Sequence, residues 1–323
     1  MALWLPYFLK EASTLAPSVD LLMWVEIAIS AFFTGLIFVA LFYFAVKYRR
    51  KSEDEIPEQI QGSIPLEVAW TVIPIIIVIV LFVWGAELFI RNARPPENAV
   101  HVYVVAKQWM WKLQHPEGPR EIDTLHVPVG EPVELIMTSE DVIHDFSVPA
   151  FRVKMDVLPD HYSTIWFTPS KTGQYRLYCD QYCGTGHSTM RGYVYVMSRG
   201  AYAQWLSGGM HHVQSMAAAG AELFEQYGCI TCHGTGKAPP FVGLYGSTVR
   251  LEGGQTVVAD DAYIRQSVLD PSSQIVLGYK PIMPTFQGQI SEDQILEIIA
   301  YIRSLENQPG AQGARPAPAK EKK

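Results

Sequence analysis

The stretch Cys179-Asp-Gln-Tyr-Cys183-Gly-Thr-Gly-His187-Ser-Thr-Met190 places two thiols, an imidazole and a thioether within twelve positions of one loop. Soft sulfur ligands of this kind favour copper over magnesium or calcium. The loop follows the alternating run Gln174-Tyr-Arg-Leu-Tyr, so a strand at the rim of a rigid sheet can hold it. The pattern predicts a copper-binding loop on a β-domain.

The number of sulfurs narrows the kind of metal site. A one-copper site needs a single thiolate, whereas two thiolates separated by three residues suit the bridging of two copper ions. A second imidazole, His144, can reach the loop from a neighbouring strand connection. Two alternatives remain: a zinc site, although zinc rarely uses Met, and a Cys179–Cys183 disulfide, which would leave His187 and Met190 without a role.

Short alternating runs surround the loop from about residue 99 to residue 198. They are His101-Val-Tyr-Val-Val, Val133-Glu-Leu-Ile-Met, Thr164-Ile-Trp-Phe and Tyr193-Val-Tyr-Val. Alternation with period two, broken by Pro and Gly, predicts an antiparallel sandwich or barrel.

The first ninety residues differ sharply from the remainder. Ile27–Val46 is a run of 20 residues without a charge, and Val68–Ala86 is a run of 19. Each run matches the roughly 20 apolar residues that cross a bilayer, so we expect two transmembrane helices at about residues 24–46 and 68–89. Buried helices of a soluble core are the alternative, but such helices normally carry a polar face. Basic residues at 47–51 place the connector in the cytoplasm and both termini outside.

Length and charge exclude other classes of protein. A chain of 323 residues predicts two or three structural units. The net charge of −7 and the absence of a basic face with interleaved aromatics argue against nucleic-acid binding. The four cysteines form two close pairs, which is the spacing of ligand motifs rather than of a disulfide framework.

The second cysteine pair lies in Cys229-Ile-Thr-Cys232-His233, a haem-attachment motif in which two thiols form thioethers and the imidazole binds iron. A thioredoxin-like redox pair is the alternative, but no βαβ pattern surrounds the motif. Met283, in Pro281-Ile-Met283-Pro, can supply the sixth iron ligand, and a helical pattern follows from Ser291. The helical period dominates residues 221–306, which predicts an all-α domain.

These patterns divide the chain into five parts. We expect a transmembrane hairpin over residues 1–95, a β-domain over 96–200, a linker over 201–220, a haem domain over 221–306 and a disordered tail over 307–323. His211 and His212 fall in the linker and are expected to be solvated rather than to bind metal.

The loop motif Cys-x-x-x-Cys-Gly-x-x-His-x-x-Met, with Asp141-Val-Ile-His144 upstream, resembles the dinuclear copper centre (CuA) of cytochrome c oxidase subunit II. The resemblance spans about residues 20–200 and implies a cupredoxin-like Greek-key domain. The ligands that it implies are Cys179 and Cys183 as bridges, His144 and His187 as terminal ligands, Met190 as a weak ligand and the backbone carbonyl of Gln181.

The resemblance extends to two further segments. Lys107-Gln-Trp109-Met-Trp111 is similar to the aromatic strand of the family, which implies that electrons enter at Trp109. Glu67-Val-Ala-Trp-Thr-Val-Ile-Pro74 is similar to the segment whose Glu lies at the entrance of a proton pathway into subunit I. Many family members have Glu where this chain has Gln181, and that Glu touches magnesium, so the resemblance no longer supports a magnesium site here.

A class I cytochrome c domain fused behind a CuA domain is similar to the caa-type oxidases. The resemblance implies that electrons pass from an external donor through one covalently bound haem c and CuA to subunit I, where dioxygen is reduced to water and protons are translocated. The implied partners are subunit I with haem a and CuB, subunit III, membrane lipid, and a donor such as cytochrome c, another small redox protein or a quinol-oxidising complex.

The implied location is the bacterial plasma membrane, with both termini and both metal domains on the periplasmic side. Two other functions stay open at this point. The chain could be the electron-accepting subunit of a nitric oxide reductase with a CuA site, or a copper-binding or copper-delivery protein.

Overall fold

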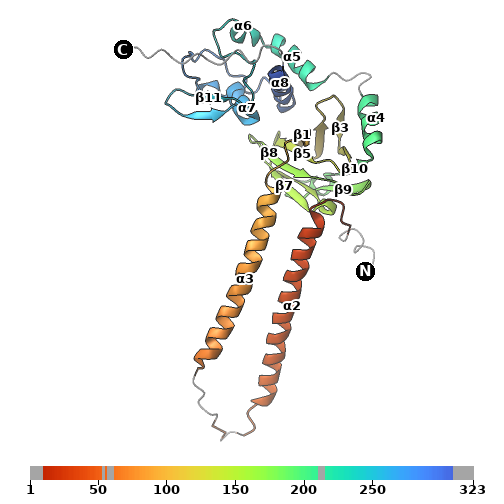
Figure 1. Cartoon of the computed structure of the whole chain (residues 1–323), viewed down its shortest axis with the longest axis vertical. Helices are drawn as coiled ribbons and strands as arrows, with labels where there is room; N and C mark the ends of the chain where they lie inside the picture. Colours follow the sequence, from red (N-terminus) through yellow and green to blue (C-terminus); the bar gives the residue numbers. More distant parts are fainter. Residues whose placement is uncertain (1–9, 53–54, 57–61, 210–214, 308–323) are drawn as a thin grey trace.

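The computed structural model describes residues 10–52, 55–56, 62–209 and 215–307. The chain forms a helical hairpin, a sandwich of strands (the β-domain, residues 100–197) and a mainly helical C-terminal domain (residues 215–307), as Figure 1 shows. This order confirms the predicted architecture. The predictions for His211, His212 and the tail from residue 308 lie outside the described residues.

The hairpin consists of α2 (Ala16–Lys47) and α3 (Ile64–Asn92), which extend together away from the β-domain (Figure 1). Their most apolar stretches have no buried residues, and both helices are long and apolar enough to cross a membrane. Both helices extend beyond the predicted spans. The sequence window recognised only the apolar centre, whereas backbone hydrogen bonds continue through the polar ends.

The first helix is attached to the β-domain at its N-terminal end. Arg152 forms two hydrogen bonds to the carboxylate of Asp20, at 2.6 Å and 2.8 Å. Just ahead of the helix, the backbone N–H of Ala12 donates to the carbonyl oxygen of Ala150 at 2.9 Å. These contacts fix the β-domain to the N-terminal end of α2.

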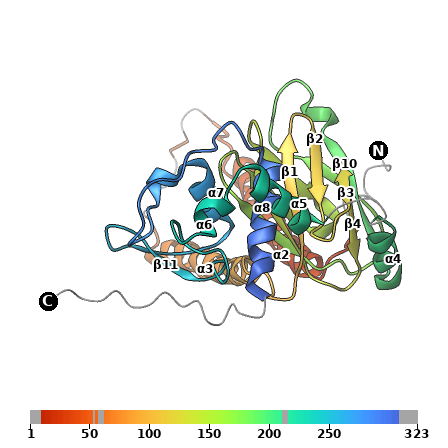
Figure 2. The same ribbon diagram turned by 90° about the horizontal axis from the view of Figure 1, so that it is seen from above.

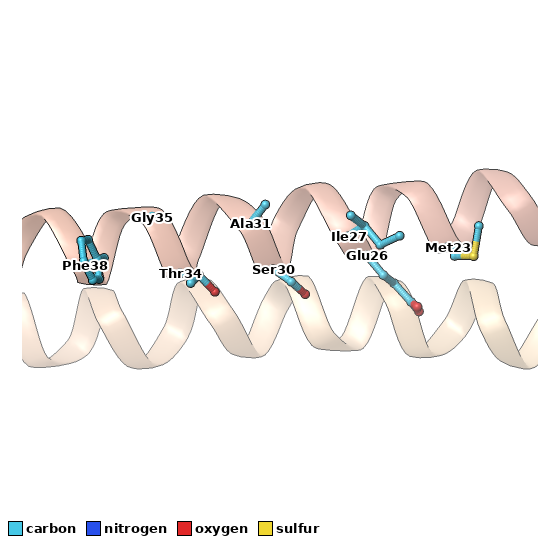
Figure 3. Close-up of a pocket in the computed structure, with 8 residues that line it drawn as sticks. All are labelled: Met23, Glu26, Ile27, Ser30, Ala31, Thr34, Gly35 and Phe38. Atoms are coloured by element: carbon cyan, nitrogen blue, oxygen red, sulfur yellow. The ribbon is translucent and has the colours of Figure 1, made fainter. Parts of the chain in front are cut away.

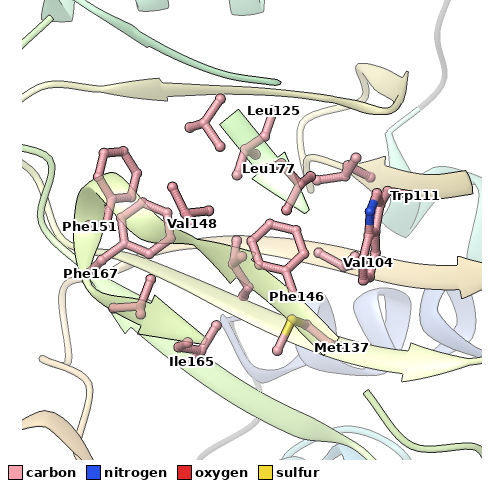
Figure 4. Close-up of a cluster of buried hydrophobic side chains, with 14 of the residues drawn as sticks. Val104, Trp111, Leu125, Met137, Phe146, Val148, Phe151, Ile165, Phe167 and Leu177 are labelled. Carbon is pink, nitrogen blue, oxygen red and sulfur yellow. The ribbon is translucent and has the colours of Figure 1, made fainter. Parts of the chain in front are cut away.

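The β-domain contains two five-stranded sheets, with strand orders β3-β2-β1-β5-β8 and β4-β10-β9-β6-β7. The strands are β1 (Val100–Lys107), β2 (Met110–Gln114), β3 (Arg120–Ile122), β4 (Thr124–Pro128), β5 (Val133–Ser139), β6 (His144–Val148), β7 (Val153–Val157), β8 (Ser163–Phe167), β9 (Gly173–Cys179) and β10 (Arg191–Met197). The core between the sheets includes Trp111, Phe146, Phe151 and Leu177 (Figure 4).

Two strand pairs differ from the antiparallel arrangement that we expected. β1 pairs parallel with β5, and β10 pairs parallel with β4. Parallel neighbours need a long crossover connection, and the chain provides one for β1 and β5 by passing through β2, β3 and β4 between them. The predicted sandwich is therefore confirmed with a mixed strand order.

The C-terminal domain contains α5 (Met216–Gln226), α6 (Ile230–His233), α7 (Asp261–Leu269) and α8 (Glu292–Ser304). α8 begins with a capping box in which Ser291 and Gln294 satisfy each other's backbone N–H groups. A Cβ atom on Gly220 of α5 would lie 2.0 Å from the carbonyl oxygen of Glu297, so only glycine permits this helix crossing.

Two features of this half were not predicted. A short hairpin of β11 (Thr248–Arg250) and β12 (Thr256–Val258) interrupts the helices. The expected linker begins as a helix, α4 (Arg199–Gly209), which packs against β4 and β10. Its aromatic residues pack on one another and on the sandwich, since Tyr202 stacks on Trp205 with ring centroids 5.8 Å apart and Trp205 stacks on His126 with ring centroids 4.6 Å apart.

Candidate copper and haem sites

The ends of two adjacent strands bring the copper-loop residues together. Phe146 of β6 is paired with Cys179 at the end of β9, so His144 at the start of β6 lies beside that cysteine. The His144 Nδ1 atom is 3.9 Å from the Cys179 sulfur, and the two cysteine sulfurs are 3.9 Å apart. These three residues form a group of ligand atoms close enough to hold a metal ion.

The remaining predicted positions surround the same sulfur pair. His187 begins the short helix η2 (His187–Thr189), and its Nδ1 lies 3.5 Å from the Cys183 sulfur. The Met190 sulfur is 3.8 Å from the Cys183 sulfur, and the Gln181 carbonyl oxygen is 3.2 Å from the Cys179 sulfur. All six residues predicted from the sequence therefore meet at one place.

Asp141 orients the buried imidazole of His144. The His144 side chain is fully buried, and its Nε2 atom lies 2.9 Å from the Asp141 carboxylate. With Nε2 held in this way, Nδ1 is directed toward the sulfur pair, which is the usual way in which a carboxylate orients a metal-binding His. The other carboxylate oxygen of Asp141 accepts from the backbone N–H of Gln108 at 2.8 Å.

Trp109 lies against the copper loop and remains 39 % exposed. Its indole N–H donates to the carbonyl oxygen of Cys183 at 3.2 Å, and the side-chain amide of Gln108 donates to the same oxygen at 2.7 Å. A Cβ atom on Gly186 would lie 2.4 Å from the indole ring, so glycine is required for this contact. The role of Gln108 was not predicted from the sequence. Its position directly before Trp109 was an available signal, and so was the position of Asp141, its partner, three residues before His144.

The two thiols have opposite tendencies to ionise. Burial favours the neutral thiol of Cys179, but hydrogen bonds from His144 and from the backbone outweigh it and lower the pKa of this cysteine. Burial raises the pKa of Cys183 to about 12, and repulsion from Cys179 adds to the effect. Two neighbouring thiolates therefore require a nearby positive charge, which a bound metal supplies.

The second predicted site surrounds a cavity of about 1000 Å³ in the C-terminal domain. Cys229, Cys232 and His233 line it together with Met283. The predicted attachment motif and the predicted sixth ligand thus face the same space, although they are far apart in the sequence. The rest of the lining is mostly apolar, as the face of a porphyrin requires.

His233 is held in the orientation that a haem ligand needs. Its Nδ1 atom lies 2.7 Å from the Pro239 carbonyl oxygen, to which it donates, so Nε2 is left to bind a metal. The imidazole stacks on Phe241 with ring centroids 4.0 Å apart. Burial lowers the pKa of His233, with the Pro239 hydrogen bond acting in the opposite direction, so the imidazole is kept neutral.

The cavity also carries polar groups that suit the propionates of a haem. Arg250 and Lys280 are its basic lining residues. Among the described residues, the buried Ser267 Oγ and Gln274 Oε1 atoms, whose side chains line the same cavity, have no hydrogen-bond partner. An apolar cavity with cations and unpaired polar atoms fits a haem better than a purely apolar ligand.

Three family models cover most of the chain. Residues 2–88 match the transmembrane domain of cytochrome c oxidase subunit II, residues 118–196 match its periplasmic domain, and residues 215–302 match subunit III of the cbb3-type oxidase. Cytochrome c oxidase subunit 2 of Alkalihalophilus pseudofirmus is 31 % identical over 88 % of this chain and 86 % of the relative. This chain belongs to the cytochrome c oxidase subunit II family.

Other similar proteins carry the same family name. Cytochrome c oxidase subunit 2 of Bacillus sp. PS3 is 28 % identical to this subunit II over 80 % of this chain and 79 % of that protein. The solved periplasmic domain of cytochrome oxidase subunit II from Bradyrhizobium japonicum is 26 % identical, covers 38 % of this chain and 100 % of its own, and has a TM-score of 0.36.

Family membership accounts for the two sites. The periplasmic domain of subunit II implies CuA copper, and the cytochrome c domain implies haem. The chemistry of both donor sets fits these groups. Membership also implies a membrane protein with a periplasmic domain and a partnership with subunit I of a haem-copper oxidase.

Glu67, the predicted proton-pathway residue, lies away from both sites. It occupies the first turn of α3 with its side chain exposed, at the end of the hairpin distant from the β-domain (Figure 1). Within the described residues, the structure brings it to neither the copper loop nor the haem cavity.

Proposed function

We propose that this subunit II is the part of a terminal oxidase that accepts electrons from an external donor and passes them through haem c and CuA to subunit I, where dioxygen is reduced. The observation that carries this proposal is the convergence of six copper-type ligands in a chain that also frames a haem cavity. When bound, copper and haem supply reversible one-electron chemistry that amino-acid side chains lack.

In the copper site, Cys179, Cys183, His144 and His187 would hold the two ions. Met190 and the Gln181 carbonyl would serve as weaker ligands. Asp141 holds the imidazole of His144 in its orientation through the 2.9 Å contact with Nε2. Trp109, bonded to the Cys183 carbonyl at 3.2 Å and exposed on its other side, is the residue where electrons enter.

In the haem site, Cys229 and Cys232 would attach one haem covalently, and His233 and Met283 would hold its iron. Met/His ligation raises the iron potential, which suits a carrier that feeds a high-potential copper site. Gln181 supplies no carboxylate, so we propose no magnesium site at the boundary with subunit I.

The membrane hairpin provides the contact with subunit I. A shallow groove along α2 is lined by Glu26, Ser30, Thr34, Gly35 and neighbouring residues (Figure 3). Small and weakly polar residues on a transmembrane helix let another helix approach closely. Glu67 lies at the opposite, cytoplasmic end, where it collects protons for subunit I, and both metal domains lie on the periplasmic side. Subunit III completes the complex, and a small redox protein such as cytochrome c is the donor.

The test is metal and haem analysis of the purified complex, followed by turnover assays with dioxygen and with nitric oxide. We expect two coppers and one acid-stable haem c per chain, and consumption of dioxygen with the donor. Zinc in place of copper, or haem that acidified acetone extracts, would refute the assignment of the sites. Turnover with nitric oxide alone would favour the reductase, and neither alternative function has support in the family models that match.

A further inference from the structure

Strand β1 is buried on both of its faces. Val102 and Val104 point into the core between the two sheets. Tyr103 and Val105 point the other way and, with Ile136 of β5, join the hydrophobic cluster of the C-terminal domain. Figure 2 shows α8 lying beside β1, between the β-domain and the rest of the C-terminal domain. We call this outer face of β1 and β5 the seat.

In the part of the chain that the structure describes, three ion pairs and one backbone hydrogen bond join the two domains around the seat. The pairs join Lys112 to Asp293, Arg120 to Glu297, and Arg265 to Asp160. The Arg265 side chain is 7 % exposed and lies 2.9 Å from Asp160. The backbone N–H of Met216 donates to the Pro116 carbonyl oxygen at 3.3 Å. Arg265 is also paired with Glu292 of its own domain, at 2.5 Å, so Asp160 adds a contact across the domain boundary to an arginine that its own domain already holds in place.

The seat connects the haem cavity to the copper end of the β-domain. Lys112 lies 3.0 Å from Asp293 in the first turn of α8 and 2.5 Å from Glu140. Glu140 directly precedes Asp141, which orients His144. In the C-terminal domain, the segment that directly precedes α8 includes Met283, which lines the haem cavity.

The haem cavity itself does not open onto the seat. Its lining residues all belong to the C-terminal domain, between Phe224 and Ile302. Ile298 and Ile302 show that α8 lines the cavity with one face, while Asp293 and Glu297 bind the β-domain with another. The lining of the cavity and the contacts with the β-domain therefore use different faces of α8.

We propose that the C-terminal domain stays docked on the seat throughout electron transfer, with Lys112 and Asp293 as positioning residues that keep the two metal sites at a constant separation. The inference rests on the proposed function only for the identity of the two metal groups. The docking itself depends only on contacts between amino-acid residues. It involves no covalent bond and no proton transfer.

The first test is cross-linking of the whole chain, with its cofactors, by a carbodiimide that joins ammonium and carboxylate groups in direct contact. Peptide mass spectrometry should find Lys112 joined to Asp293. Lys107 and Glu140 form the matched control because they lie 2.9 Å apart within the β-domain and do not depend on docking. A Lys107–Glu140 product without any Lys112–Asp293 product would overturn the proposal.

Val105→Glu places an unpaired carboxylate in the seat and should reduce the Lys112–Asp293 product at least about tenfold, because the seat cannot close over a lone buried charge. The Lys107–Glu140 product, the copper signal and the haem spectrum should persist. Val258→Glu, on a valine that is 55 % exposed, is the matched control and should change no product. An undiminished Lys112–Asp293 product in Val105→Glu contradicts the seat.

The second test uses no buried substitution. The rate of electron exchange between the two metal sites, after flash reduction, should not change when glycerol raises the viscosity. In Asp293→Arg, which alters a side chain that is 32 % exposed, the rate should fall and become viscosity-dependent. A viscosity-dependent rate in the unmodified chain refutes docking but leaves the proposed function intact. No exchange at any viscosity refutes the proposed function.

Discussion

The copper loop and the haem cavity hold their groups by different means. His144 and Cys179 lie at the ends of paired strands, and the other proposed copper ligands lie in the loop between β9 and β10. The Asp180 N–H donates to the Asp145 carbonyl oxygen at 3.2 Å, which fixes the start of that loop. The proposed haem residues surround a space of about 1000 Å³, with Cys232 and His233 in the one-turn helix α6 and Met283 in a segment without regular secondary structure. Since a packed interior stabilises a small domain, the C-terminal domain should depend on its cofactor for folding, whereas the β-domain should not.

The largest effect is expected from removal of the haem attachment in the C-terminal domain. Cys229→Ser combined with Cys232→Ser removes both thioether bonds, and we expect the C-terminal domain to lose most of a typical domain stability of about 5 to 15 kcal/mol. Limited proteolysis and circular dichroism measure the loss, with Thr231→Ser as the control inside the same motif. A C-terminal domain that resists protease as well as the unmodified one would mean that the haem is not part of its core.

Loss of a bridging thiolate tests the copper side. Cys183→Ser should abolish the mixed-valence signal of the dinuclear copper centre, while the free energy of unfolding of the β-domain changes by only about 1 to 2 kcal/mol, as is usual for a single substitution. Haem c should still accept electrons from the donor and then remain reduced. Electron paramagnetic resonance and thermal unfolding give both values, and Ser188→Ala is the control. Transfer from haem c to subunit I at an undiminished rate would show that copper is not an obligatory step.

A smaller change is expected from the sixth iron ligand. Met283→Leu keeps the volume of the side chain but removes the thioether that favours reduced iron. The midpoint potential of haem c should fall by on the order of 0.1 V, a fraction of the roughly 0.8 V that axial ligands can span. Redox titration of the visible spectrum measures it, with Ile282→Leu as the neighbouring control. An unchanged potential would assign the sixth position to another residue.

The smallest effect concerns the pH dependence of the β-domain where α4 joins it. Burial favours the neutral form of Glu121, but hydrogen bonds from His115 and His126 outweigh it and lower its pKa. A lowered pKa adds stability that is complete above the unfolded value of about 4.3 and is lost as the pH falls below it. Glu121→Gln should remove this part of the acid dependence. Unfolding curves from pH 3 to 7, about one unit apart, test it, and an identical acid dependence would contradict the role of Glu121.

Local spacing was enough to predict that most of the proposed copper ligands lie close together. Cys179, Gln181, Cys183, His187 and Met190 belong to one loop, so neighbours in sequence are neighbours in space. The haem motif was predictable for the same reason. The partners of these residues were harder to predict, because Gln108 reaches Cys183 across 75 positions and only the sandwich brings them together.

The alternating pattern of β1 correctly predicted a strand, but it did not predict that the C-terminal domain covers the outer face of that strand. His101-Val-Tyr-Val-Val was expected to belong to a sandwich, and it does, but nearly every residue in it is apolar because a second domain covers the outer face. A strand that is apolar on both faces is typical of burial on both sides. The composition of this run was the available signal for the seat.

Composition and short-range spacing predicted by themselves the membrane hairpin, the strand-rich middle, the helical end and the two cysteine motifs, because each depends on residues close together in the chain. Only the tertiary structure decided the parallel pairing of β1 with β5, the orientation of His144 by Asp141 and the contact of Lys112 with Asp293. The last of these joins residues separated by 181 positions. Such contacts arise from the packing of whole elements, and no local pattern records which distant surfaces will meet.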